Sequence, residues 1–94
     1  TMFRAVLECP SFASTDVSSL RTGIMAGAPC PVELMKLVTT RLHMPEVAIG
    51  YGMTETSPLS TLSARDDPHE RRVSSVGRVL PHLEISIRDP GTGR

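Results

Sequence analysis

The stretch "GIMAGAPCPVELMKLVTTRLHMPEVAIGYG", Gly23 to Gly52, places two short apolar runs on either side of an amphipathic segment. The runs Gly23–Ala26 and Val47–Tyr51 are bounded by glycine or proline, which is typical of buried strands. Between them, Val32–His43 has apolar residues at helical spacing, with basic residues in the last turn. A strand, a helix and a second strand within about 30 residues predict a βαβ unit with parallel strands.

Both predicted strands end in a glycine-bearing loop. Gly27, Ala28 and Pro29 follow the first strand, and residues 50–55 follow the second. Parallel strands present their carboxyl ends at one edge of the sheet, and ligands of open α/β sheets bind outside that edge. We therefore expect the two loops to lie side by side and to frame one ligand site.

The segments that flank this unit have weaker patterns. Met2–Glu8 has apolar residues at helical spacing, and this helix should end at Cys9, which precedes a proline. After the unit, the weakly alternating residues 59–64 indicate a possible strand. The charged residues 65–72 contain a proline and indicate an exposed loop.

A further β segment is predicted towards the end of the chain. Leu83, Ile85 and Ile87 alternate with polar residues, as in a half-buried antiparallel strand. The predicted fold class is therefore α/β, with a βαβ unit of a parallel sheet followed by a β-rich segment. We expect a boundary near Ser74–Gly77, with residues 1–73 in the α/β subdomain and residues 74–94 at the start of a β subdomain.

Charge and composition argue against several classes of partner. The 94 residues carry 10 basic and 10 acidic side chains, so nothing indicates a nucleic-acid footprint. No apolar run approaches the roughly 18 residues that a transmembrane helix needs, and no secretory signal is visible. The chain starts at Thr1 within a predicted helix and ends in a predicted turn. We therefore expect it to be a central segment of a longer protein.

The two cysteines, Cys9 and Cys30, have neither the spacing of a metal site nor that of a disulfide framework. This usage favours a reducing compartment, the cytoplasm or an organelle matrix if the source is eukaryotic. Cys30 precedes the predicted helix, where a helix dipole lowers thiol pKa values. We interpret it as a capping position rather than a nucleophile.

The residues around Tyr51 have the chemistry of a nucleotide site. Gly50 and Gly52 let the backbone approach a flat ligand, and the ring offers a stacking face. Thr54 brings a hydroxyl donor for an anionic oxygen, and Glu55 is a hard oxygen ligand of the kind that Mg²⁺ takes together with phosphates. The alternative is an ordinary turn with a capping threonine and a solvated carboxylate.

Three motifs in this order resemble those of the adenylate-forming superfamily, which includes acyl-CoA synthetases, luciferases and peptide-synthetase adenylation domains. "YGMTE", Tyr51 to Glu55, is similar to the family's YGxTE motif, and "GIMAGAPCP" is similar to its glycine-alanine-proline stretch. "SVGRVLPHLEISIRD", Ser75 to Asp89, resembles the segment that follows. The resemblance covers roughly Leu20 to Asp89 and is strongest to fatty-acyl-CoA synthetases of the medium-chain kind.

The resemblance implies an N-terminal-domain position for this chain and assigns its nucleotide contacts. Tyr51 would stack on adenine, and the loop at residues 27–29 would line the adenine pocket. Residues 1–73 would then belong to the nucleotide-binding subdomain. The implied nucleotide-binding positions are Gly27, Ala28, Pro29, Gly50, Tyr51, Gly52 and Thr54.

The resemblance also implies a reaction. The substrate carboxylate would attack the α-phosphate of ATP, pyrophosphate would leave, and the CoA thiol would displace AMP. Thr54 would hold a phosphate oxygen and Glu55 would bind the Mg²⁺, so these two are the implied catalytic residues. Gly50, Val76 and Gly77 would border the acyl pocket.

Several parts of the family's site have no counterpart in these residues: the phosphate loop with its lysine, the ribose-binding aspartate and the lysine of the C-terminal domain. We therefore expect the remainder of a longer chain to complete the site, and the 94 residues alone to be inactive. Two alternatives remain at this point. One is an adenylation domain for amino acids or aryl acids, and the other is a non-catalytic nucleotide-binding module, which alone would bind AMP with micromolar affinity.

Overall fold

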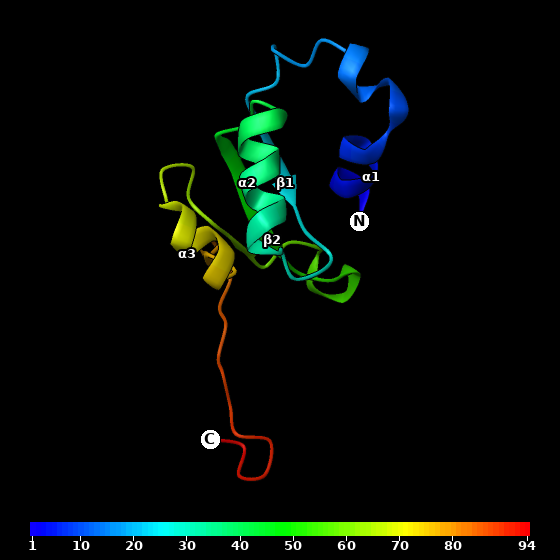
Figure 1. Cartoon of the computed structure of the whole chain (residues 1–94). Coiled ribbons are helices and arrows are strands. Elements are labelled where there is room, and N and C mark those ends of the chain that lie inside the picture. The colour runs from blue at the N-terminus through cyan, green and yellow to red at the C-terminus, as the bar shows by residue number, and fades with distance from the viewer.

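The computed structural model describes residues 1–94, which form three α-helices, two 3₁₀ helices and four strands (Figure 1). In chain order these are α1 (Met2–Glu8), η1 (Pro10–Ser14), β1 (Thr22–Met25), α2 (Val32–Arg41), β2 (Glu46–Tyr51), η2 (Thr54–Thr56), β3 (Thr61–Leu62), α3 (His69–Ser74) and β4 (Arg78–Val79).

The four strands form one mixed sheet in the order β1-β2-β3-β4. β1 and β2 are parallel, with Thr22 opposite Glu46 and Met25 opposite Ile49. β3 pairs with β2 and β4 pairs with β3, both antiparallel. This arrangement confirms the predicted α/β class, in which a βαβ unit precedes a β-rich segment.

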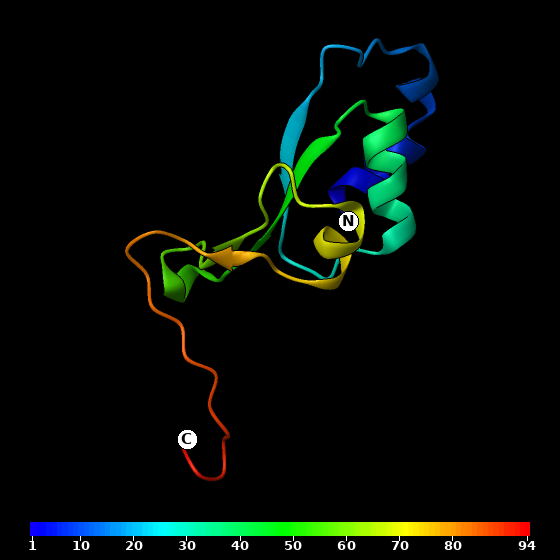
Figure 2. The ribbon, with the colours of Figure 1, turned by 90° about the vertical axis from the view of Figure 1, so that its left-hand side faces the viewer.

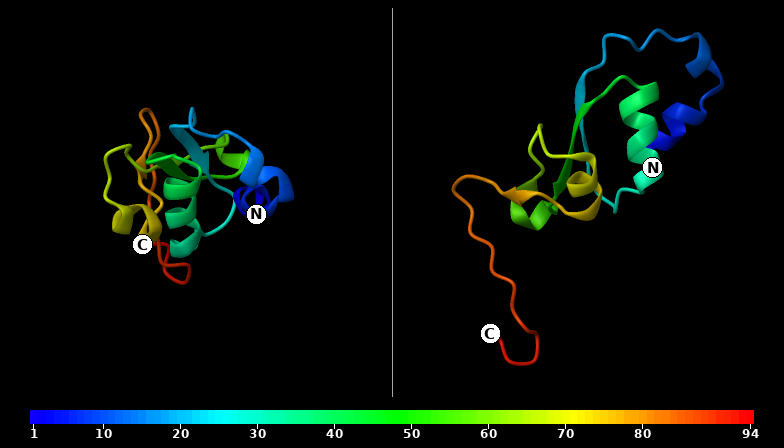
Figure 3. Two further views of the ribbon diagram at one scale, coloured as in Figure 1. Left: turned by 45° about the horizontal axis from the view of Figure 1, so that its top comes forward. Right: turned by 60° about the vertical axis from the view of Figure 1, so that its left-hand side comes forward.

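The helices gather on one face of the β1–β2 pair (Figures 2 and 3). α2 and α3 each contact β2, and α1 packs against α2. Burial of the apolar stripe of α2 against the strands is the main source of stability in a unit this small. The buried core residues are Leu7, Met25, Leu34, Met35, Val38, Leu42, Met44, Val47 and Ile49.

Two predicted helix ends agree closely with the structure. α1 ends at Glu8, where Cys9 takes an extended conformation ahead of its proline. α2 ends at Arg41, two residues before the predicted end. The reason is local, because His43 has a φ of +54°, in the left-handed region that terminates helices. None of the helices is long and apolar enough to cross a membrane.

The expectation of an exposed loop at residues 65–72 was correct only for residues 65–68, of which Asp67 alone is buried, and wrong for the rest. The helix α3 starts at His69, directly after Pro68, and both Asp67 and Arg72 are buried. The carboxylate of Asp67 accepts a hydrogen bond from the Ala64 amide at 2.7 Å and forms an ion pair with Arg78 at 3.4 Å. Charges that are paired and hydrogen-bonded in this way tolerate burial, which charge clustering in the sequence does not reveal.

The expected half-buried strand at Leu83–Ile87 was also wrong. Residues 81–90 are exposed, with Ile87 97% exposed, and the chain there runs away from the sheet (Figure 1). An alternating pattern makes a strand only where a neighbouring strand supplies hydrogen bonds, and no strand of this chain lies beside this segment. The division of the chain at residues 73 and 74 stays a prediction.

Candidate functional site

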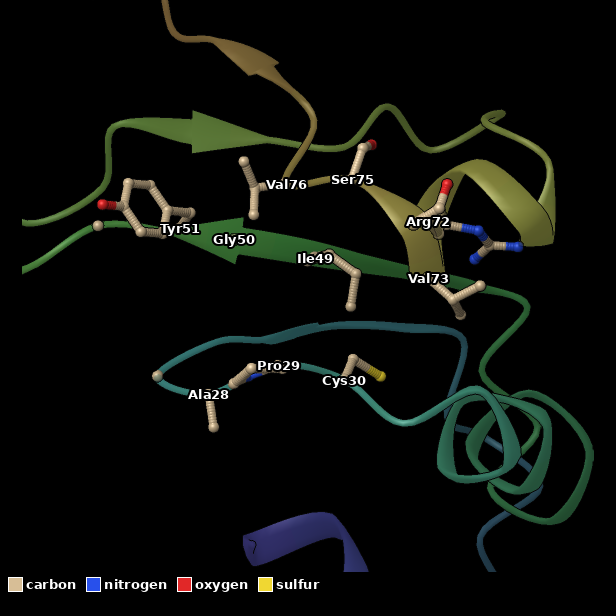
Figure 4. Close-up of a pocket in the computed structure, with 13 residues that line it drawn as sticks. Ala28, Pro29, Cys30, Ile49, Gly50, Tyr51, Arg72, Val73, Ser75 and Val76 are labelled. Carbon is tan, nitrogen blue, oxygen red and sulfur yellow. The ribbon is translucent and has the colours of Figure 1, made fainter. Parts of the chain in front are cut away.

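The two glycine-bearing loops line one cavity of about 510 Å³ (Figure 4). Its walls come from residues 27–30 after β1, residues 49–52 at the end of β2, and residues 72–76 at the end of α3. The expectation that the first two segments lie side by side is therefore confirmed. A cavity of this size falls within the usual range for small-molecule sites.

The strand register explains why the loops meet. Met25 lies opposite Ile49, so the chains that leave β1 and β2 emerge at the same edge of the sheet. The third wall, residues 72–76, lies in the chain between β3 and β4, which pair next to β2 in the sheet. The Thr61 hydroxyl donates a hydrogen bond to the carbonyl of Val76 at 2.6 Å and holds that residue at the cavity.

Tyr51 is the last residue of β2 and is 48% exposed, so its ring is accessible rather than sealed in the interior. Its carbonyl accepts a hydrogen bond from the Ser60 amide at 2.8 Å, which fixes the backbone below the ring. In Figure 4, Tyr51 and Ala28 lie towards one end of the cavity, and Val73 lies towards the other. This end offers a flat ligand an aromatic face and a wall of backbone and small side chains.

Seven of the residues predicted for the site line the cavity, and three do not. The seven are Gly27, Ala28, Pro29, Gly50, Tyr51, Gly52 and Val76. Thr54 and Glu55 lie just beyond the rim in η2, and both are exposed. Gly77 follows Val76 with a φ of +85° and does not itself line the cavity.

Glu55 stands as a single carboxylate, because the chain contains no cluster of three or more metal-binding side chains. This setting fits Mg²⁺, which proteins commonly hold through one or two carboxylates together with phosphate oxygens and water. A site for Zn²⁺ would require at least three protein ligands. Glu55 and the hydroxyl of Thr54 thus have the donor chemistry expected for a metal–phosphate group, and their roles stay predictions.

Six lining residues were not predicted: Cys30, Ile49, Arg72, Val73, Ser74 and Ser75. The first two adjoin predicted loops, so widening each loop by one residue would have found them. The other four reach the cavity only because α3 folds back against β2. That contact is tertiary, and no local pattern in the sequence indicates it.

The thiol of Cys30 is a poor nucleophile at this site. Burial raises its pKa, because a thiolate loses solvation when it is partly enclosed. The expected capping role was wrong, since Pro31 is the residue that precedes the first turn of α2. Cys30 instead directs its thiol towards the sulfur of Met25, 3.9 Å away, and contributes an apolar surface to the cavity.

The chain has clear relatives among known proteins. A family model described as "AMP-binding enzyme" matches residues 1–94. The putative acyl-CoA synthetase YngI of Bacillus subtilis is 52% identical over 92 residues, which are 98% of this chain and 17% of that protein. The mitochondrial medium-chain acyl-CoA ligase ACSF2 of Bos taurus is 43% identical over 93 residues, which are 99% of this chain and 15% of the ligase.

Solved structures give the same assignment. The amide bond synthetase McbA from Marinactinospora thermotolerans superposes with a TM-score of 0.73 at 32% identity, over 95% of this chain and 18% of that chain. The N-terminal domain of FACL13 from Mycobacterium tuberculosis gives a TM-score of 0.67 at 32% identity, over 83% of this chain and 19% of that one. The chain spans less than a fifth of the length of each of these proteins. The chain therefore belongs to the family of AMP-binding enzymes.

Proposed function

We propose that this chain supplies the adenine- and acyl-binding walls of an ATP-dependent acyl-CoA ligase. The parent protein would activate a fatty acid of medium length as acyl-AMP and transfer the acyl group to CoA. The observation that carries the proposal is the cavity of about 510 Å³ between residues 27–30 and 49–52, with Tyr51 accessible at its edge. The names of the relatives, an acyl-CoA synthetase and a medium-chain acyl-CoA ligase, support the choice of reaction.

Adenine is the ligand that best suits the end of the cavity at Tyr51. The half-exposed ring can stack on a purine, and stacking of a base on an aromatic side chain contributes about 1–3 kcal/mol. The opposite wall, Gly27, Ala28 and Pro29, has no charged side chain and presents backbone polar groups to the ring edge. Gly52 has no room for a side chain, because an added methyl group would overlap the backbone of Pro58 and Leu59.

The acyl chain would lie next to Gly50. An added methyl group at this position would meet Leu59 Cδ1 at 2.8 Å and Ile24 Cγ2 at 3.4 Å, so packing outside the cavity requires glycine here and only its backbone borders the cavity. Val76 adds a further apolar wall, and Gly77 lets the backbone turn there. Together with Ile49 and Val73, this apolar lining favours a hydrocarbon chain over the charged group of an amino acid, because an unpaired buried charge is costly.

The phosphates would lie beyond the rim, beside Thr54 and Glu55. The Thr54 hydroxyl would donate to a phosphate oxygen, and the Glu55 carboxylate would hold the Mg²⁺ of ATP. When bound, Mg²⁺ supplies positive charge that neutralises the triphosphate. The residues of this chain would hold the base, the acid and the phosphates in position. Alignment of the reacting groups in this way lowers the barrier to phosphoryl and acyl transfer.

The remaining assignments extend this proposal. Residues 1–73 would belong to the nucleotide-binding subdomain and residues 74–94 to the β subdomain that follows it. ATP, the carboxylic acid and CoA would be the small-molecule partners, and no nucleic acid is expected. The location would be the cytoplasm or, in a eukaryote, the matrix of an organelle, and the ACSF2 relative is a mitochondrial protein.

A pyrophosphate-exchange assay tests the function. The full-length protein is expected to exchange pyrophosphate into ATP when a medium-chain fatty acid is present, and much less with aryl acids or amino acids. The isolated 94-residue chain serves as the matched control and should give no exchange, because only part of the site is present. Preference for an amino acid or an aryl acid would contradict the proposed substrate. Absence of exchange with every acid, together with tight AMP binding, would indicate a non-catalytic module.

The acceptor is tested in the same reaction, since one of the matched proteins, McbA, is an amide bond synthetase. The acyl-adenylate is offered CoA or a primary amine of equal concentration. The thioester is the expected product, and exclusive formation of the amide would contradict the assignment as a CoA ligase.

A further inference from the structure

Arg72 is the single charged side chain among the residues that line the cavity, and it is only 9% exposed. A buried guanidinium is costly unless a carboxylate or other acceptors compensate for its lost hydration. Arg72 has no carboxylate partner. Asp67, the buried carboxylate at the start of the same helix, instead forms ion pairs with Arg71 at 3.7 Å and Arg78 at 3.4 Å.

The compensation for Arg72 comes from the backbone at the start of β2 and from the residue before it. Its Nη1 donates hydrogen bonds to the carbonyl of Pro45 at 2.8 Å and to the carbonyl of Val47 at 2.9 Å. The Nε of Arg72 is buried and has no partner in the chain. The guanidinium therefore joins the middle of α3 to the beginning of β2 across 25 to 27 positions of sequence.

This link lies between two walls of the site. The two acceptor carbonyls lie at the start of β2, and residues 49–52 at its other end line the cavity. Residues 73–76 directly follow Arg72 in the chain and form the α3 wall. In Figure 4 the guanidinium extends under α3, at the opposite end of the cavity from Tyr51. It is therefore placed to fix the walls rather than to contact a base stacked on Tyr51.

We propose that Arg72 is a positioning residue that sets the separation of the β2 wall and the α3 wall of the cavity. Its two hydrogen bonds hold Val73–Val76 at the distance from β2 that the ligand requires. The inference rests on the proposed function only in taking AMP and a carboxylic acid as the ligands. The two hydrogen bonds that carry it lie within this chain. Loss of the link lets the α3 wall shift, so the ligand loses contacts with Val73–Val76 and binds more weakly.

Arginine is suited to this role by its shape. One planar nitrogen with two hydrogens reaches two carbonyls of the same chain segment, Pro45 and Val47, and the fork loses little rotational freedom when it binds. A lysine at the same position keeps the charge and the apolar stem, but its compact ammonium does not reproduce the planar geometry. A glutamine removes the charge and shortens the reach.

The test uses the full-length protein with Arg72→Gln and Arg72→Lys. Arg72→Gln is expected to raise the Kd for AMP and the KM for the acid by at least about tenfold, and to change kcat less than about threefold. Arg72→Lys should fall between Arg72→Gln and the unmodified protein. The matched control is Arg71→Gln, the neighbouring arginine of α3, whose side chain is 57% exposed. This control should leave both constants within about twofold.

Melting temperatures are measured for each variant, because a purely structural arginine would lower them without changing ligand affinity. Unchanged Kd and KM in the folded Arg72→Lys and Arg72→Gln variants would overturn the proposal, and so would equal effects of Arg71→Gln. The Kd for AMP requires no turnover. An inactive unmodified protein would therefore refute the proposed function and still leave the role of Arg72 decided.

A measurement without substitutions covers the case in which Arg72→Gln does not fold. Hydrogen exchange of the unmodified protein is followed with and without AMP. Residues 45–49 and residues 73–76 should become protected together, because Arg72 couples the two walls. Protection of one segment without the other would contradict the proposal.

Discussion

Replacement of Glu55 by alanine is expected to slow formation of the acyl-adenylate by about 100-fold or more in the full-length protein, without loss of the fold. Glu55 is exposed in η2 and makes no ion pair, so its removal leaves no buried group unsatisfied. Its proposed partner is the Mg²⁺ of ATP. The rate is measured by pyrophosphate exchange at saturating ATP and acid, over a range of Mg²⁺ concentrations.

The control for this substitution is Glu33→Ala. Glu33 is an exposed glutamate in the first turn of α2 and forms a surface ion pair with Lys36 at 2.9 Å. A surface pair of this kind contributes at most about 1 kcal/mol, so this variant should retain its activity. Excess Mg²⁺ should restore part of the activity of Glu55→Ala and should not affect Glu33→Ala. A Glu55→Ala variant as fast as the unmodified protein would show that the carboxylate has no part in adenylation.

The substitution with the largest expected effect on stability is Gly77→Ala. Gly77 has a φ of +85°, and an added methyl group would overlap backbone atoms of Leu62 and Ser63. The left-handed conformation costs an alanine about 1–2 kcal/mol, and overpacking adds about 1–3 kcal/mol. Backbone atoms of β3 cannot move aside as a flexible side chain can. We therefore expect the melting temperature to fall by about 10 °C or the soluble yield to be lost.

Gly27→Ala separates the two contributions at Gly77. Gly27 has nearly the same backbone conformation, with a φ of +83°, but no atom lies within 4 Å of an added methyl group. This variant should show only the conformational cost of about 1–2 kcal/mol and a small fall in melting temperature. Equal losses in the two variants would mean that close contact with β3 is unimportant and that the wall at Val76 is held in another way.

The βαβ unit could be predicted from the sequence because its signals are local. Apolar runs bounded by glycine and proline marked β1 and β2, and helical spacing marked α2. Parallel pairing then placed the loops after both strands at one edge. The meeting of residues 27–29 and 50–52 in the candidate site followed from this single geometric rule.

The rest of the site depends on contacts that local patterns do not encode. The segment with Asp67 and Arg72 has the composition of a solvated loop, yet it forms a helix that covers β2 and brings residues 72–76 to the cavity. Its charges are buried because the carboxylate meets two arginines and the guanidinium meets two backbone carbonyls. The alternating pattern of Leu83, Ile85 and Ile87 led to the opposite error. It predicts a strand, but none forms, because no neighbouring strand pairs with this segment.

A crystal structure of the full-length protein with AMP would test the central claim most directly. Our account predicts the adenine ring between the backbone of residues 27–29 and the ring of Tyr51, with the phosphate directed towards Thr54. Adenine bound elsewhere in the protein, or a Tyr51 ring turned away from the nucleotide, would contradict the account.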